Sequence, residues 1–340
     1  MVHTFHCLDA NIAVDVNSGA VHVLDQTAYD LLSLLDGPMA EHCPDEVAAK
    51  LPQYDRESLN CAWDDLYQLQ QQGLLFTDDT YIDPEAAVLM QKDAPVKALC
   101  LHVSHDCNLR CKYCFASAGE YHMHGSRLMS FETGKRALDW LVEKSGKRHS
   151  LEVDFFGGEP LMNFDVVKQL VAYGRSQEKE HNKKFRFTIT TNGVLLNDEI
   201  LDFVNQEMGN IVLSIDGRKE VNDRMRPFRN GNGSSYDLIL PKFKKVAESR
   251  HQDNYYVRGT YTHFNKDFAS DVLHLADQGF EQISVEPVVA PASQPYAIKE
   301  EDVPELCAEY DRLAKEILAR RKAGKGFNFF HLSLIHISEP

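Results

Sequence analysis

The feature that most constrains the fold is an alternation of strand-like and helical patterns that begins near residue 96. Runs rich in β-branched and aromatic residues predict strands at 96–103, 151–156, 185–190, 211–215, 255–262 and 283–288. Helical patterns follow them at 131–144, 165–180, 198–208, 236–249, 268–278 and 304–322. Such repeats imply parallel strands with right-handed crossovers, and six units are too few to close an eight-unit barrel. We therefore expect an α/β domain built as a partial (β/α)6 barrel, with ligands beyond the C-terminal strand ends.

The first 83 residues follow a different pattern. The hairpin signal Asn17-Ser18-Gly19 separates two short strand-like runs, and helical patterns come next; these elements are 11–14, 20–24, 26–35, 45–51 and 56–72. This order predicts a small α+β module of winged-helix type at 1–83, then a linker at 84–95 and the larger domain at 96–331. The module contains two basic and fifteen acidic residues, a net charge of −13 out of −15 for the chain. So acidic a surface repels phosphate backbones, and we expect no nucleic-acid partner.

The N-terminus and the cysteine usage indicate the compartment. There is no apolar run of about 18 residues, and no basic segment leads into an apolar stretch at the N-terminus. We therefore expect a cytoplasmic protein with no membrane partner. Five of the eight cysteines are scattered, and we expect them to be small buried residues: Cys7, Cys43, Cys61, Cys100 and Cys307. Clustered cysteines in a cytosolic protein indicate metal binding or redox chemistry.

The three clustered cysteines follow directly after the first predicted strand. Cys107, Cys111 and Cys114 have the spacing CxxxCxxC. One short loop of this kind can wrap a corner of an iron–sulfur cubane, with three thiolates holding three irons and the fourth iron open to a cofactor or substrate. The alternative is a zinc knuckle, for which a nearby histidine would supply the fourth ligand: His105, His122 or His124.

Further motifs follow the next predicted strands at the same expected edge. They are Gly157-Gly158-Glu159-Pro160, Thr191-Asn192-Gly193 and Ser214-Ile215-Asp216-Gly217. Paired glycines let a backbone approach a ligand closely, and the Glu159 carboxylate can accept hydrogen bonds from an ammonium group. Ser214 and Asp216 are two residues apart on a strand end and so face one side, where they suit ribose hydroxyls. Arg224 or Arg226 could pair with a carboxylate. Ordinary turn chemistry and solvated side chains are the alternative throughout.

Together these motifs resemble those of the radical S-adenosylmethionine (SAM) superfamily, and more narrowly its SPASM-type peptide maturases. The segments closest to the SCIFF peptide maturases are DVNSGAVHVLD at 15–25 and ALCLHVSHD at 98–106. Members of that family form thioether cross-links in a short ribosomal peptide with six cysteines. The resemblance covers roughly residues 1–331.

The resemblance implies a mechanism and a set of site residues. Cys107, Cys111 and Cys114 would hold a 4Fe–4S cluster whose open iron chelates SAM. The implied cofactor contacts are Gly157, Gly158, Glu159, Asn192, Ser214, Asp216, Arg224 and Tyr113, with Glu159 at the SAM amino group and Ser214 at the ribose. Reduction by a donor such as flavodoxin or ferredoxin would cleave SAM to methionine and a 5′-deoxyadenosyl radical. That radical would abstract hydrogen from a peptide residue, and a peptide cysteine sulfur would bond to the same carbon.

The acidic module at 1–83 resembles a recognition element for ribosomally synthesised and post-translationally modified peptides (RiPPs). Such elements bind the leader of a precursor peptide against a strand edge, here 20–24, and a negative charge favours a leader with basic residues. An N-terminal cap on the larger domain is the alternative. The implied partner is therefore a Cys-rich precursor peptide held through its leader.

The C-terminal region departs from the family pattern. SPASM regions carry auxiliary clusters and need further cysteines, yet Cys307 is the last one, and 332–340 does not read as native sequence. We therefore expect a C-terminally truncated chain that lacks the SPASM region and cannot complete thioether formation alone. Phe327, Phe329 and Phe330 would then be exposed where that region docks. Two further alternatives are a sulfatase-maturase-like enzyme and a non-catalytic, zinc-containing peptide-binding protein.

Overall fold

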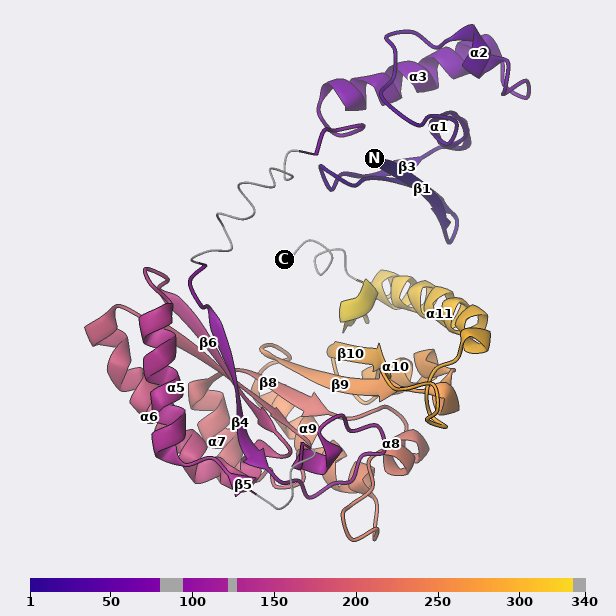
Figure 1. Ribbon diagram of the computed structural model, residues 1–340. Helices are drawn as coiled ribbons and strands as arrows, with labels where there is room; N and C mark the ends of the chain where they lie inside the picture. The colour runs from indigo at the N-terminus through magenta and orange to yellow at the C-terminus, as the bar shows by residue number, and fades with distance from the viewer. Residues whose placement is uncertain (80–93, 122–126, 333–340) are drawn as a thin grey trace. The chain divides into compact units, whose positions relative to one another are not determined.

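The computed structural model describes residues 1–79, 94–121 and 127–332 (Figure 1). Most of the expected linker, His122, His124 and residues 333–340 of the expected tail lie outside the described residues. The chain divides into two compact units, with the boundary between Ala94 and Pro95. Within the described ranges, no helix is both long enough and apolar enough to cross a membrane.

The N-terminal unit packs helices against a small antiparallel sheet. Its elements are β1 (Val2–Cys7), β2 (Ala10–Asp15), β3 (Val21–Leu24), α1 (Gln26–Leu32), α2 (Asp45–Ala48) and α3 (Arg56–Gln71), and the strand order is β1-β2-β3. The predicted hairpin is confirmed, because β2 and β3 pair around a turn in which Gly19 has a φ of 72°. Trp63 on α3 is buried in the core of this unit. The sequence analysis missed β1, whose outward-facing polar residues mask the apolar alternation.

Asp15 joins the hairpin of this unit to its C-terminal end. Its buried carboxylate accepts hydrogen bonds from the backbone N–H of Ser18 at 2.9 Å and of Thr77 at 3.0 Å. Burial alone would raise the pKa of Asp15, but hydrogen bonds from Thr77 and Ser18 lower it to about 2. An ionised Asp15 therefore connects two segments that are far apart in the sequence.

The second unit is an α/β fold built on a mostly parallel sheet. The strands are β4 (Ala98–His105), β5 (Arg127–Leu128), β6 (Ser150–Gly157), β7 (Lys184–Thr191), β8 (Met208–Ser214), β9 (Tyr255–Tyr261), β10 (Gln282–Pro287) and β11 (Asn328–Phe329). Their order is β11-β10-β9-β8-β7-β6-β4-β5, and β5 is antiparallel to β4. All six predicted strands are confirmed to within a few residues. The two-residue strands β5 and β11 are too short to leave a periodic signal.

Helices cover one face of this sheet (Figure 1). They are α5 (Phe131–Lys144), α6 (Phe164–His181), α7 (Asp198–Glu207), α8 (Lys219–Met225), α9 (Ser235–Ser249), α10 (Phe268–Asp277) and α11 (Val303–Lys322), of which only α8 was not predicted. Strand residues such as Val153, Phe155 and Phe187 are fully buried against them. Their neighbours along each strand turn to the opposite face, because side chains alternate on a strand.

Two expectations about exposure are wrong. Phe327 and Phe329 are 6% and 2% exposed. They are buried because β11 adds to the edge of β10 and carries Phe329 into the core. Of the five scattered cysteines, only Cys43 is buried; Cys7, Cys61, Cys100 and Cys307 are exposed. The exposed ones lie on solvent-facing helix positions or on the strand faces turned away from the cores.

Candidate functional site

The loops after β4, β6, β7 and β8 converge on one cavity of about 430 Å³. The predicted residues that line it are Cys107, Cys111, Cys114, Tyr113, Gly157, Gly158, Asn192 and Ser214. These residues come from four loops that are far apart in the sequence, and the parallel sheet brings its C-terminal strand ends to one edge.

Two of the sulfur atoms of the loop after β4 receive hydrogen bonds from backbone N–H groups. The backbone N–H of Leu109 donates to Cys107 Sγ at 3.4 Å, and that of Ala118 donates to Cys114 Sγ at 3.3 Å. Burial raises the pKa of Cys107 to about 12 and that of Cys111 to about 11, so these thiols need nearby positive charge to ionise. Iron supplies such charge, and N–H donors stabilise sulfur that carries negative charge. The three cysteines therefore fit a cluster that is held by thiolates.

The structure describes only one of the three histidines named in the zinc alternative. His105 packs its ring against Tyr121, with 4.9 Å between the ring centroids. The other two candidate ligands, His122 and His124, lie outside the described residues.

The paired glycines let the end of β6 pack directly on the loop after β4. A Cβ at Gly158 would lie 2.1 Å from the carbonyl oxygen of Asp106. A Cβ at Gly157, whose φ is +127°, would lie 2.3 Å from the carbonyl oxygen of Ser104. Both glycines also line the cavity. Their first role is therefore backbone contact with the cysteine loop, and any side chain there would displace that loop.

Glu159 is fully buried and holds the Thr191-Asn192-Gly193 motif in place. Its carboxylate accepts hydrogen bonds from Thr191 Oγ1 at 2.7 Å, from the backbone N–H of Asn192 at 2.8 Å and from that of Leu161 at 3.0 Å. Burial raises the pKa of Glu159, although these donors oppose the shift. Glu159 does not itself line the cavity, whereas Asn192 does. Asn192 Nδ2 lies 3.6 Å from Cys107 Sγ.

Tyr113, Asp216 and Arg226 form a buried cluster beside the cysteines. The Tyr113 hydroxyl donates to Asp216, and Arg226 Nη1 donates to the Tyr113 oxygen at 2.9 Å. Arg226 Nη1 also lies 3.5 Å from Asp216 Oδ1. Burial raises the pKa of Asp216, and Arg226 opposes that shift. Burial alone would lower the pKa of Arg226, but Tyr113, Cys111 and Asp216 raise it well above its ordinary value. Asp216 is fully buried and supports this cluster from outside the cavity lining.

The two arginines that the sequence left open lie in different places. Arg226 lines the cavity, is only 8% exposed and has a buried Nε without a hydrogen-bond partner in the described structure. Arg224 instead lies over the ring of Phe264, with its guanidinium carbon 3.7 Å from the ring centroid. Residues two apart at a helix end point to nearly opposite sides. Of the two arginines, Arg226 thus lines the cavity and Arg224 does not.

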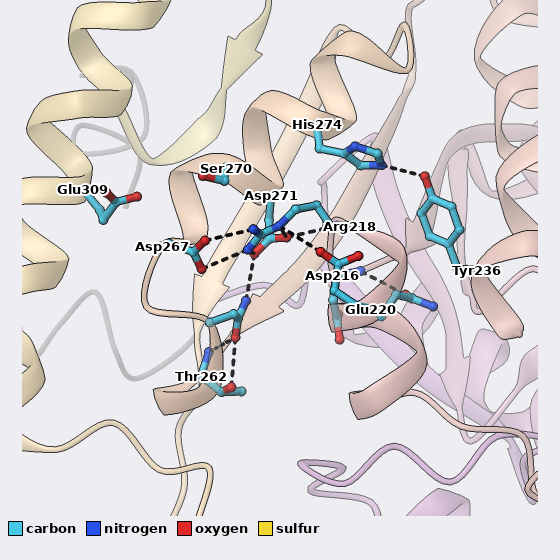
Figure 2. Close-up of polar contacts among 12 residues, drawn as sticks. Asp216, Arg218, Glu220, Tyr236, Thr262, Asp267, Ser270, Asp271, His274 and Glu309 are labelled. Atoms are coloured by element: carbon cyan, nitrogen blue, oxygen red, sulfur yellow. Dashed lines mark hydrogen bonds and ion pairs between the residues drawn. The ribbon is translucent and has the colours of Figure 1, made fainter.

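A network that the sequence analysis missed anchors the loop after β8. Figure 2 shows Arg218 between Asp267 and Asp271, both on or next to α10. Arg218 Nε donates to Asp271 Oδ1 at 2.8 Å, and its backbone N–H donates to the same atom at 3.0 Å. A Cβ at Gly217, whose φ is +130°, would lie 2.3 Å from Asp271 Cβ. No local pattern reports this contact, because it joins residues more than fifty positions apart.

The comparisons with known proteins show the family of this chain. The sequence model of the radical SAM superfamily matches residues 101–278. The radical SAM cyclopropyl synthase TigE of Paramaledivibacter caminithermalis is 28% identical over 188 residues, which cover 51% of this chain and 38% of TigE. The cysteine-type anaerobic sulfatase-maturating enzyme of Clostridium novyi is 31% identical over 149 residues, which cover 42% of this chain and 37% of that enzyme. This chain thus matches less than half the length of either relative.

A solved structure shares the fold. The structure of anSMEcpe with bound AdoMet superimposes with a TM-score of 0.59 at 18% identity, covering 70% of this chain and 64% of anSMEcpe. Another structure of anSMEcpe contains AdoMet and the peptide Kp18Cys. The superfamily match spans more than half of the chain and includes every cysteine of the CxxxCxxC loop. This chain belongs to the radical SAM superfamily, whose enzymes use a 4Fe–4S cluster and SAM.

Proposed function

We propose that this chain is the SAM-cleaving part of a peptide maturase that installs Cys-derived thioether cross-links in a ribosomal six-cysteine peptide. The observation that carries the proposal is the cavity of about 430 Å³, which the three cysteines line together with Ser214 and Arg226. Thiolates, a hydroxyl and a guanidinium are the groups needed for a cluster, a ribose and a carboxylate.

The proposed roles divide among the residues of the cavity. Cys107, Cys111 and Cys114 hold the cluster, which supplies the electron that cleaves SAM to give a hydrogen-abstracting radical. Arg226 binds the SAM carboxylate, and Ser214 binds the ribose. Glu159 lies outside the lining and fixes the backbone of Asn192, which lines the cavity beside the proposed SAM site.

The N-terminal unit supports the peptide part of the proposal. Val21 and Val23 on β3 are 42% and 75% exposed, and β3 pairs only with β2 among the described strands. A free strand edge can accept another strand through backbone hydrogen bonds. We propose that the leader of the precursor peptide adds here, and that the net charge of −13 at 1–83 selects a leader with basic residues. Flavodoxin or ferredoxin is the proposed electron donor.

A sulfatase-maturase-like activity is the second candidate, because the Clostridium novyi enzyme matches this chain at 31% identity. Deuterium transfer separates the two. The reconstituted chain is incubated anaerobically with dithionite, SAM and either a deuterated six-cysteine peptide or a deuterated single-cysteine peptide. A thioether maturase moves deuterium into 5′-deoxyadenosine from the six-cysteine peptide. Transfer from the single-cysteine peptide alone would favour the second candidate, and transfer from neither would refute both.

A further inference from the structure

A second cavity, of about 490 Å³, adjoins the first. Both cavities share four lining residues: Phe115, Phe156, Thr190 and Arg258. The rest of the second lining comes from β4, β6, β7, β8 and β9, on the face of the sheet that helices leave uncovered. A molecule bound on this face can therefore reach the cysteine site without crossing protein.

The lining of this second cavity is polar. On β6, Val153 and Phe155 are fully buried against the helices, while Glu152 and Asp154 turn to the opposite face and line the cavity. The closed interior of a parallel barrel is filled with branched apolar side chains. Carboxylates and a guanidinium at those positions indicate a surface that meets water or a polar ligand rather than a core.

Of the four charged residues that line this cavity, Glu152 and Arg258 have ion-pair partners. Lys97 Nζ lies 3.4 Å from Glu152 Oε1, and Arg258 Nη2 lies 2.7 Å from Glu286 Oε2. Asp154 and Arg186 have no ion-pair partner within 4.0 Å in the described part of the chain. What remains is the Asp154 carboxylate, which accepts a hydrogen bond from the neighbouring Thr188 side chain, and the Arg186 guanidinium on the adjacent strand. The two attract each other and together carry no net charge.

A β-bulge makes room for Arg186. The register between β7 and β8 shifts after Phe187, and Gly209 is the extra residue on β8. A Cβ at Gly209 would lie 2.6 Å from Arg186 Cγ, so the stem of Arg186 lies directly on the Gly209 backbone. Bulges re-aim side chains, and a glycine at this one leaves the space that the arginine occupies.

We propose that this uncovered face binds a peptide segment through its backbone amides and hydroxyl side chains, with Asp154 and Arg186 as the contact residues. Each peptide unit offers one N–H and one C=O, and a serine or threonine hydroxyl both donates and accepts. A carboxylate and a guanidinium with no net charge match those groups better than they match a strongly charged ligand. The inference rests on the proposed function, because it supplies the substrate surface for the same site.

The test measures peptide binding to the full, reconstituted chain by fluorescence anisotropy. One fluorescein-labelled probe consists of Gly, Ser, Thr and Cys with both ends capped, and the second replaces Ser by Ala and Thr by Val. Asp154→Asn and Arg186→Gln are each expected to weaken binding of the first probe about tenfold, since each removes a charge-assisted hydrogen bond. Gly209→Ala is expected to act like Arg186→Gln, because its Cβ displaces the arginine stem.

The controls use the same substitutions on exposed outer helices. Asp202→Asn on α7 and Arg136→Gln on α5 should change binding by less than about twofold. Iron content and the thermal midpoint should match the wild type in every variant. Unchanged binding in the Asp154 and Arg186 variants overturns the inference, as does equal binding of the two probes or no binding of the first.

Deuterium transfer separates this inference from the proposed function. If the six-cysteine peptide transfers deuterium with an unchanged KM in the Asp154 and Arg186 variants, the binding surface is refuted and the maturase proposal stands. If the probe binds with the expected variant pattern but no peptide transfers deuterium, the maturase proposal fails and the binding surface stands.

Discussion

The Tyr113 hydroxyl donates to both carboxylate oxygens of Asp216, at 2.7 Å and 2.8 Å. Tyr113 belongs to the cysteine loop, and Asp216 follows β8. Arg226 donates to the same hydroxyl and is thereby held in the lining of the cavity. Tyr113 and Asp216, which the sequence suggested as cofactor contacts, thus also position Arg226.

Tyr113→Phe is expected to raise the KM for SAM about tenfold, because Arg226 loses the hydroxyl that orients it and Asp216 loses a buried donor. Iron content should stay at the wild-type level, since the three cysteines are untouched. The measurement is the rate of 5′-deoxyadenosine formation against SAM concentration, together with iron analysis. Tyr67→Phe on α3 is the matched control. An unchanged KM would show that the hydroxyl has no positioning role.

Arg226→Gln and Arg224→Gln test which arginine serves the site. The first should raise the KM for SAM by about tenfold or more, because a buried guanidinium facing the cavity is lost. The second should change it by less than about twofold, because Arg224 lies over Phe264 outside the lining. The same SAM titration measures both. If Arg224→Gln raised the KM for SAM more than Arg226→Gln did, Arg224 would be the arginine that serves the site.

Cys111→Ala is expected to abolish SAM cleavage and to lower the iron bound after anaerobic reconstitution to a small fraction of the wild-type content, because one of three cluster thiolates is gone. Cys307→Ala removes an exposed thiol on α11 and should leave both quantities unchanged. Iron analysis, the visible absorption spectrum and 5′-deoxyadenosine formation report the outcome. Wild-type cleavage by the Cys111 variant would remove this residue from the cluster.

Asp15→Asn is expected to lower the free energy of unfolding of the N-terminal unit by about 2 kcal/mol at neutral pH. The folded-state pKa is lowered from 3.8 to about 2, so the stabilisation is complete above the unfolded pKa and is lost as the pH falls toward 2. The difference in the free energy of unfolding between wild type and variant should therefore decrease as the pH falls from the unfolded pKa toward 2. Urea unfolding followed by the fluorescence of buried Trp63, in a Trp140→Phe background, measures it. If the difference in the free energy of unfolding does not depend on pH, the loss of stability comes from packing and not from the ionised carboxylate.

Much of the fold could be predicted because its signals are local. The predicted helix 131–144 matches α5 at both ends, and each of the six predicted strands overlaps an observed one. The elements that were not predicted are short or polar: β5 and β11 have two residues each, α8 has seven, and β1 lacks a clear apolar alternation. Phe329 was placed on the surface because nothing local shows that β11 joins β10.

The sequence by itself determined the CxxxCxxC loop, the order of strands and helices, and the motifs that follow the strands, because each depends on residues that are neighbours in the chain. Only the tertiary structure decided that Arg226 rather than Arg224 lines the cavity, that Tyr113 holds Asp216, and that Asp154 and Arg186 share an uncovered face. Those relations depend on how side chains from distant segments meet. Their distances follow from sheet register, a bulge at Gly209 and the packing of helices, none of which a local pattern specifies.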